Sequence, residues 1–459
     1  MSDPATPSPW RKEIAATLRL AGPLALANLL QMAIYATDVM FVSRLGVEAL
    51  AASSLAVSIF ALINWGLLGM TGASAPLIAA ELGRKSHSVR EVRRTLRMAL
   101  WMGALCSAGG MVLCQFGEAL MLATGQKTQI AAASQHFLSI LSLALLPMIL
   151  GNVLRVFVSA MGRPVFATLI TALAIAINLA GNWLLVFGNL GMPALGLTGS
   201  ALASLITAII TLAAYVAAIQ TNRRMRRMRA WGRWWRPEWS RLREMVRLGI
   251  PIALTVVAEG GLFGSAAFLM GRIDVAQLAA HTIALQIAAL FFQVPYGIGQ
   301  AATIRVGLHY GAGDAAAAGR AGWVACGVCL ISQTIAAAVM LLVPAVLIAA
   351  YIDVRDPGNA GLTEIAARFL IIAAAFQLFD GVQAVMAGAL RGLQDTRMPM
   401  VIALSGYWLV GFVIAAWLGL GTGLEGVGVW IGLMAGLMVV AALLTWRWQA
   451  RGRLNLLPA

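Results

Sequence analysis

Charged residues are scarce in this chain, and lysine is almost absent. Only 11% of the 459 residues are Asp, Glu, Lys or Arg, and 60% are hydrophobic, whereas about 25% charged residues is usual in a soluble protein. The lysines are Lys12, Lys85 and Lys127. So little charge excludes a water-soluble enzyme of this length and predicts a polytopic membrane protein.

Cysteine and histidine are also rare, with four residues of each. Cys106, Cys114, Cys326 and Cys329 all fall inside apolar runs, so we expect packing residues and neither disulfides nor a bound metal. No Ser/His or Cys/His pair is expected at the same depth in the membrane, and the sequence has no phosphate-binding loop motif. We therefore expect no enzyme, no catalytic residues and no cofactor.

The apolar runs predict an all-α fold with twelve transmembrane helices. They lie at 17–41, 52–76, 96–116, 136–158, 164–187, 195–219, 246–270, 280–304, 319–348, 366–390, 399–420 and 425–448. This assignment places 28 of the 33 basic residues on one side of the membrane. The positive-inside rule then puts both termini in the cytoplasm.

The net charge of +15 raises the question of nucleic acid. Basic residues spread over several loops of a hydrophobic protein are better explained as topology determinants, so we expect no nucleic-acid partner. The densest tract runs from Arg223 to Arg247 and interleaves ten arginines with Trp231, Trp234, Trp235 and Trp239. This composition suits a linker lying in lipid headgroups and predicts membrane lipids as partners.

An internal repeat divides the chain. A shift of 228 residues places 44–59 over 272–287 with seven identities in sixteen, and Gly69 and Gly83 over Gly297 and Gly311. We therefore predict a tail at 1–16, a six-helix lobe at 17–219, the Trp-rich linker at 220–245, a second six-helix lobe at 246–448 and a tail at 449–459. Two such pseudo-symmetric halves are typical of secondary transporters, whose substrate site lies between them.

Three carboxylates lie inside expected spans, namely Asp38, Glu259 and Asp380. At about 1.5 Å per residue, Glu259 and Asp380 fall near the middle of a core about 30 Å thick. Arg155 and Arg305 lie near cytoplasmic ends, where their side chains can reach water. Acids without an internal cationic partner are candidates to bind a proton or a cation. The alternative is a protonated acid hydrogen-bonded to a helix backbone.

Other polar and flexible residues surround these acids in the sequence. Asn178 and Asn182 are four residues apart on one helix face and line either a cavity or a helix contact. With Gln31, which takes the place of Glu259 in the repeat, and Gln286, they form our candidate polar cleft. Our hinge candidates are Pro23, Pro251, Gly260 and Gly261, although glycines also permit close packing.

Several motifs point to a family. They are Leu278-Ala-Ala-His281, Pro295-Tyr-Gly-Ile-Gly-Gln-Ala-Ala302, Gly311-Ala-Gly-Asp314, Phe376-Gln-Leu-Phe-Asp380-Gly-Val-Gln383, and Asp38-Val-Met-Phe-Val42. Together they resemble the NorM-like branch of the multidrug and toxic compound extrusion (MATE) family over residues 17–448. The resemblance implies that Glu259 and Asp380 bind the coupling cation, with Na⁺ as one candidate. It also implies a polar site of Asp38, Asn178 and Asn182.

The resemblance implies efflux of amphipathic or cationic xenobiotics in exchange for Na⁺ or H⁺ by alternating access. It further implies a multi-pass protein of the bacterial cytoplasmic (inner) membrane, and we expect it to work as a monomer. The rival function is a flippase for lipid-linked oligosaccharides or other lipids of the related superfamily. Those proteins commonly have fourteen spans and a cationic cavity, whereas this chain has twelve predicted spans and an acidic interior.

Overall fold

The computed structural model describes residues 8–84, 89–228, 231–232 and 236–457, and these form helices without any strand. Eleven helices are long and apolar enough to cross a membrane, or twelve when one bent helix pair counts as a single span. Each of the twelve predicted spans coincides with a helix or with consecutive helices. The all-helical membrane fold is therefore confirmed.

The chain forms two compact units whose boundaries fall inside helices. One unit is Leu26–Ala253, and the other joins Met1–Ala25 to Leu254–Ala459. The boundaries lie within α1 (Pro9–Ser43) and α11 (Trp239–Ile273), two unbroken 35-residue helices. The first part of each helix thus belongs to one unit and the rest to the other.

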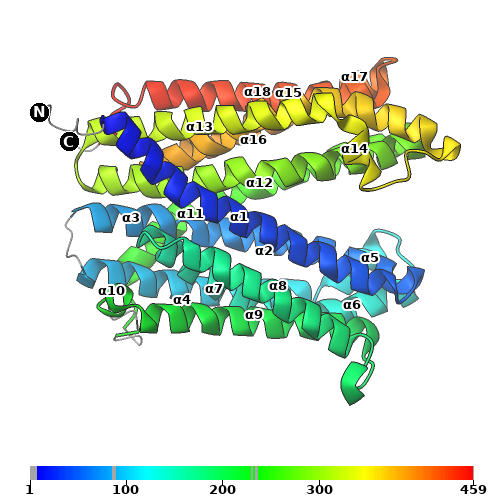
Figure 1. The fold of residues 1–459 in the computed structure, drawn as a ribbon, viewed down its shortest axis with the longest axis horizontal. Helices are drawn as coiled ribbons and strands as arrows, with labels where there is room; N and C mark the ends of the chain where they lie inside the picture. The colour runs from blue at the N-terminus through cyan, green and yellow to red at the C-terminus, as the bar shows by residue number, and fades with distance from the viewer. Residues whose placement is uncertain (1–7, 85–88, 229–230, 233–235, 458–459) are drawn as a thin grey trace, which may run out of the picture. The chain divides into compact units, whose positions relative to one another are not determined.

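The unit Leu26–Ala253 contains the later part of α1, the first part of α11, and the helices between them. These are α2 (Val47–Gly72), α3 (Ser74–Arg84), α4 (Val89–Cys114), α5 (Gly117–Ala123), α6 (Thr128–Ser142), α7 (Leu145–Ala160), α8 (Val165–Leu185), the short η1 (Asn189–Gly191), α9 (Gly196–Thr221) and α10 (Arg223–Arg226). Phe60, Leu138 and Leu145 are buried in a hydrophobic cluster of this unit. Because α8 packs along α9 (Figure 1), polar side chains of both helices can meet.

The other unit is arranged around α15 (Ala360–Gly392). Its remaining elements are α12 (Val275–Gly311), α13 (Ala315–Leu342), α14 (Pro344–Ala349), η2 (Pro357–Asn359), α16 (Arg397–Leu404), the π-helical η3 (Ser405–Phe412), α17 (Val413–Gly421) and α18 (Glu425–Gln449). α15 packs along α12, α13 and α18, which lie beside it in Figure 1. Phe376 of α15 meets Trp430 of α18 edge to face, with ring centroids 5.6 Å apart. A polar residue on α15 is therefore held inside a packed aromatic core.

Proline explains two departures from uniform spans. The expected span 136–158 bends by 42° between α6 and α7, where Pro147 has no N–H to offer the Leu143 carbonyl. The expected span 319–348 is interrupted where Pro344 begins α14. A further departure is η3, where the backbone hydrogen bonds over 405–412 span five residues instead of four. Such π-helical segments often occur at functional sites.

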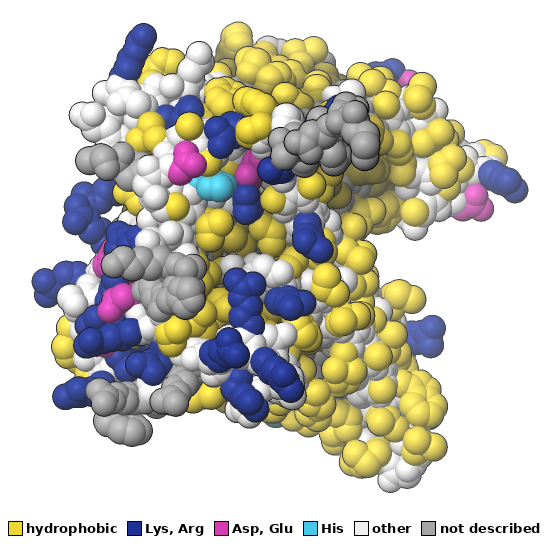
Figure 2. Space-filling model, turned by 60° about the vertical axis from the view of Figure 1, so that its left-hand side comes forward, with side chains coloured by type: hydrophobic (Ala, Val, Ile, Leu, Met, Phe, Trp, Pro, Cys, Tyr) yellow, Lys and Arg dark blue, Asp and Glu magenta, His cyan; other side chains and the backbone are white. Residues whose placement is uncertain are grey.

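Basic side chains gather at one end of the helices. Figure 2 shows Lys and Arg in dark blue toward the left, while hydrophobic side chains cover most of the rest of that view. In the predicted linker, Asn222 caps α10 by accepting from the backbone N–H of Arg224 and of Met225, and α11 begins at Trp239. Trp234 and Trp235 lie outside the described residues.

We call α1 and α11 the crossing helices, because each is divided between the two compact units. Each is packed against a glycine of the other sequence half. A Cβ added at Gly69 on α2 would lie 2.7 Å from the Cα of Ala253 on α11. A Cβ added at Gly297 on α12 would lie 2.6 Å from the backbone nitrogen of Ala25 on α1. The 228-residue shift relates Gly69 to Gly297 and Ala25 to Ala253. The repeat therefore builds the same close helix crossing in both units, and only glycine leaves room for it.

We predict that Gly69→Val and Gly297→Val each destabilise the protein by about 1–3 kcal/mol, because the added carbons meet backbone atoms that cannot move aside. Thermal unfolding in detergent measures the effect. Gly327→Ala on α13 is the control, since a Cβ there meets nothing within 4 Å. Equal melting temperatures for all three variants would contradict the close crossing.

Candidate functional site

Two carboxylates, the buried Asp380 and the partly buried Glu259, share one amide in the unit built around α15. The Nε2 of Gln383 donates to Oε1 of Glu259 at 3.0 Å and to Oδ1 of Asp380 at 3.2 Å. Tyr407 donates its hydroxyl to Oε1 of Gln383 at 2.7 Å. Asp380 is 4% exposed and Tyr407 is fully buried. The amide therefore holds the two acids near each other, and we name these four residues the Glu259 cluster.

Three elements bring the Glu259 cluster together. Glu259 comes from α11, Asp380 and Gln383 stand three residues apart on one face of α15, and Tyr407 comes from η3. Gly261 on α11 allows η3 to approach, because a Cβ there would lie 3.0 Å from Cζ2 of Trp408. Close packing is thus a structural role for one of the glycines predicted as hinges.

No salt bridge joins Glu259 or Asp380 to a basic side chain within the part of the chain that the structure describes. Arg391, near the end of α15, interacts electrostatically with Glu259 without forming a salt bridge. Carboxylates that lack a salt-bridge partner in a low-dielectric interior attract a proton or a metal cation. The Glu259 cluster has the chemistry of a monovalent cation site.

A second carboxylate lies in the unit Leu26–Ala253. Oδ1 of Asp38 on α1 accepts from Nδ2 of Asn178 at 2.9 Å and from Nδ2 of Asn182 at 2.8 Å, both on α8. Its Oδ2 accepts from the hydroxyl of Ser204 on α9 at 3.2 Å. Thr37 completes the group by donating to Oδ1 of Asn178 at 3.0 Å. This Asp38 cluster satisfies the carboxylate with neutral donors only.

The other predicted residues lie outside both clusters. Gln31 is half-buried on α1, and Gln286 is exposed on α12. Pro23 and Pro251 lie within the unbroken α1 and α11, two residues before the unit boundaries. Gly260 follows Glu259 on α11. The structure therefore brings together the predicted acids and asparagines but not the two glutamines.

Arg155 and Arg305 lie near helix ends as expected and are partly exposed. Each also has a partner within the protein. Arg155 donates to Oδ1 of Asn28 on α1, and Arg305 pairs with Glu13. An acid or amide many residues away in the sequence supplies each partner, which hydropathy cannot show.

Sequence reasoning missed Gln383, Tyr407 and Ser204. Gln383 had a signal, since it follows Asp380 by three residues and so shares its helix face. Tyr407 and Ser204 are joined to the acids only by the fold. A buried amide pair was also missed one turn from Asp380, where Gln333 of α13 donates to Oε1 of Gln377 at 2.7 Å.

An all-helical chain with membrane-length helices and buried or partly buried carboxylates in both compact units has the make-up of a membrane transporter. The sequence matches the MatE family over residues 23–184 and 251–417. It is 46% identical to a probable multidrug resistance protein NorM of Mesorhizobium japonicum, covering 97% of this chain and 95% of that protein. It is 35% identical to the multidrug resistance protein NorM of Burkholderia vietnamiensis, covering 97% and 96%. The chain belongs to the MatE family, whose members are transporters and not enzymes.

Solved structures share the fold. A mutant of the Vibrio cholerae MATE transporter VcmN has a TM-score of 0.88 at 16% identity, with 98% of this chain and 99% of that chain covered. The eukaryotic MATE transporter AtDTX14 has a TM-score of 0.85 at 20% identity, with 97% and 98% covered. The resemblance read from the sequence motifs is confirmed at the level of family and fold.

We predict that Tyr407→Phe destabilises the protein by about 1–3 kcal/mol, because Oε1 of Gln383 is then buried without its donor. Thermal unfolding with and without Na⁺ measures the change. Tyr351→Phe is the matched control, since Tyr351 lies between spans and is 41% exposed. A Tyr407→Phe protein as stable as the control would mean that the hydroxyl does not hold the Gln383 amide.

Proposed function

We propose that this chain is a multidrug efflux antiporter, which exports amphipathic organic cations and takes up H⁺ or Na⁺ in exchange. The MatE family and the NorM relatives support the efflux of drugs. One observation carries the coupling step: Gln383 joins two carboxylates, the partly buried Glu259 and the buried Asp380, that have no salt-bridge partner among the described residues.

Competition for the same carboxylates supplies the coupling. An organic cation and the coupling ion each neutralise the Glu259 cluster, so binding of one lowers the affinity for the other. Outside the cell, the coupling ion displaces the drug. The ion-loaded protein then returns its site to the cytoplasm, where the ion leaves and another drug binds. The Asp38 cluster is the corresponding polar site for substrate or ion in the other unit.

The membrane arrangement is part of the proposal. The basic loops support a cytoplasmic location of both termini, and bacterial relatives support the inner membrane. The bodies that move are the sequence halves 17–219 and 246–448, and Pro23 and Pro251 are the hinges. The linker lies against the lipid headgroups. Both halves lie on one chain, so a monomer suffices.

The flippase function is less well supported. A cavity for the anionic headgroup of a lipid-linked oligosaccharide requires arginine or lysine where substrate binds. The residues found together inside both units are instead carboxylates with neutral hydrogen-bond donors.

We predict that Glu259→Gln, Asp380→Asn and Asp38→Asn each slow the export of an organic cation from proteoliposomes by roughly tenfold or more, since each removes a charge needed for binding. Glu364→Gln is the control, because Glu364 is exposed and pairs with Arg368 on the surface. Wild-type rates in all three variants would rule out the carboxylate mechanism.

Separate ion gradients test the coupling. We expect inward gradients of H⁺ or of Na⁺ to drive export, and we expect export against a concentration gradient to stop when both are dissipated. The membrane potential contributes about 2.3 kcal/mol per charge per 100 mV. Measurement of drug movement in proteoliposomes with each gradient imposed alone identifies the ion. Uphill export that needs ATP and neither gradient would contradict antiport.

A further inference from the structure

Two ion-pair clusters, which we call clasps, form at the N-terminal ends of α1 and α11. In the first clasp, Glu13 of α1 accepts from Nε of Arg305 at 2.8 Å and from its Nη2 at 2.6 Å, and His309 lies 3.3 Å from Glu13. Arg305 and His309 are one turn apart near the end of α12. Glu13 lies at the start of α1, which continues into the first sequence half, and its partners lie in the second.

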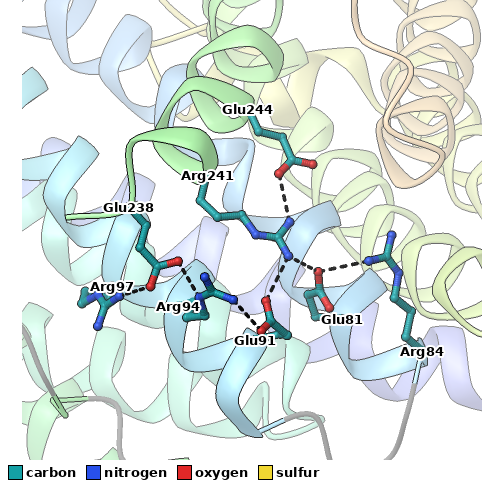
Figure 3. A network of polar contacts seen from close by, with 8 residues as sticks. All are labelled: Glu81, Arg84, Glu91, Arg94, Arg97, Glu238, Arg241 and Glu244. Atoms are coloured by element: carbon teal, nitrogen blue, oxygen red, sulfur yellow. Dashed lines mark hydrogen bonds and ion pairs between the residues drawn. The ribbon is translucent and has the colours of Figure 1, made fainter. Parts of the chain in front are cut away.

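The second clasp lies in the other unit (Figure 3). Arg241 at the start of α11 donates through Nη2 to Glu81 of α3 at 2.7 Å and to Glu91 of α4 at 3.3 Å. Glu238, three residues earlier, extends it by accepting from Arg94 at 2.5 Å and from Arg97. Here α11 continues into the second sequence half, and the partners on α3 and α4 lie in the first.

The internal repeat relates the two clasps. The 228-residue shift that superposes the halves places Glu13 over Arg241 and Glu81 over His309. The same shift relates the glycine crossings of α1 and α11. Contacts that recur at equivalent positions in both halves belong to the architecture of the repeat.

The polarity of the clasps is reversed. An acid on α1 meets basic residues, whereas a basic residue on α11 meets acids. If the start of either helix took the place of the other, Glu13 would face Glu81 and Arg241 would face Arg305. Like charges would then be brought together, so each helix end accepts only its own partner.

The main pairs are largely shielded from water. The side chains of Glu13 and Glu81 are 8% and 6% exposed, and those of Arg305 and Arg241 are each 19% exposed. Pairs this buried hold a defined geometry and are costly to separate, unlike surface ion pairs. They are therefore strong enough to favour one conformation over another.

We propose that the two clasps form an ionic lock on the cytoplasmic side of the transporter. The inference rests on the proposed alternating access of the two sequence halves. Each clasp joins a crossing helix of one half to helices of the other, and each lies beside loops that their basic residues assign to the cytoplasmic side. The lock is closed while the site faces outward, and both clasps open when the halves separate toward the cytoplasm.

A reversible cross-link tests whether the lock must open. In a background with Cys106, Cys114, Cys326 and Cys329 replaced by Ala, we introduce Glu13→Cys with His309→Cys and treat the protein with a short bis-methanethiosulfonate linker. We expect cross-linking to reduce organic-cation export at least tenfold, and reduction of the linker to restore it. Wild-type export by the cross-linked protein would overturn the proposal.

The matched control joins two positions within one sequence half. Arg447 donates to Asp395 at 2.6 Å, and both residues lie in the second half, so a cross-link between Arg447→Cys and Asp395→Cys should leave export unchanged. Equal loss of export for both pairs would show that any linker at this end blocks transport and would overturn the lock.

A labelling experiment tests the lock without any transport assay. Thr17 is fully buried one turn after Glu13 on α1. We expect Glu13→Gln to increase alkylation of Thr17→Cys by a membrane-permeant thiol reagent at least fivefold, and Glu364→Gln to leave it unchanged. Unchanged alkylation in Glu13→Gln would overturn the lock, whereas absence of export with increased alkylation would count against the antiport function alone.

Discussion

The cost of a carboxylate inside the membrane is the constraint on which this structure depends. A charge in the hydrocarbon layer costs several kcal/mol unless it is neutralised or well solvated. Asp38 is held by two amides and a hydroxyl, and Glu259 and Asp380 share one amide. Neutral donors stabilise the carboxylates without cancelling their charge. The proposed affinity for cations depends on this remaining charge, which a salt bridge would cancel.

Two of these acids lie on the helices that are divided between the compact units. α1 and α11 each contribute to both compact units, and Gly69 and Gly297 let them pass close to their neighbours. Asp38 follows one unit boundary on α1, and Glu259 follows the other on α11. Each acid therefore lies on a helix that is divided between the two units.

Much of this architecture could be predicted from the sequence, because a membrane imposes strong rules on hydropathy and charge. The twelve spans, the family and the proximity of Asp38 to Asn178 and Asn182 agree with the structure. The bend near Pro147 and the break at Pro344 had local signals that span counting ignores. Partners distant in sequence could not be predicted: Tyr407 with Gln383, or Glu13 with Arg305, meet only after the helices pack.

Competition between a drug and the coupling ion is the central claim, and equilibrium binding tests it most directly. A labelled organic cation is titrated onto the purified protein in nanodiscs at several Na⁺ concentrations and pH values. Competition at the Glu259 cluster predicts that its apparent Kd rises with Na⁺ or with falling pH, and that this rise disappears in the Glu259→Gln/Asp380→Asn double variant. A Kd independent of both ions in the wild type would contradict the mechanism.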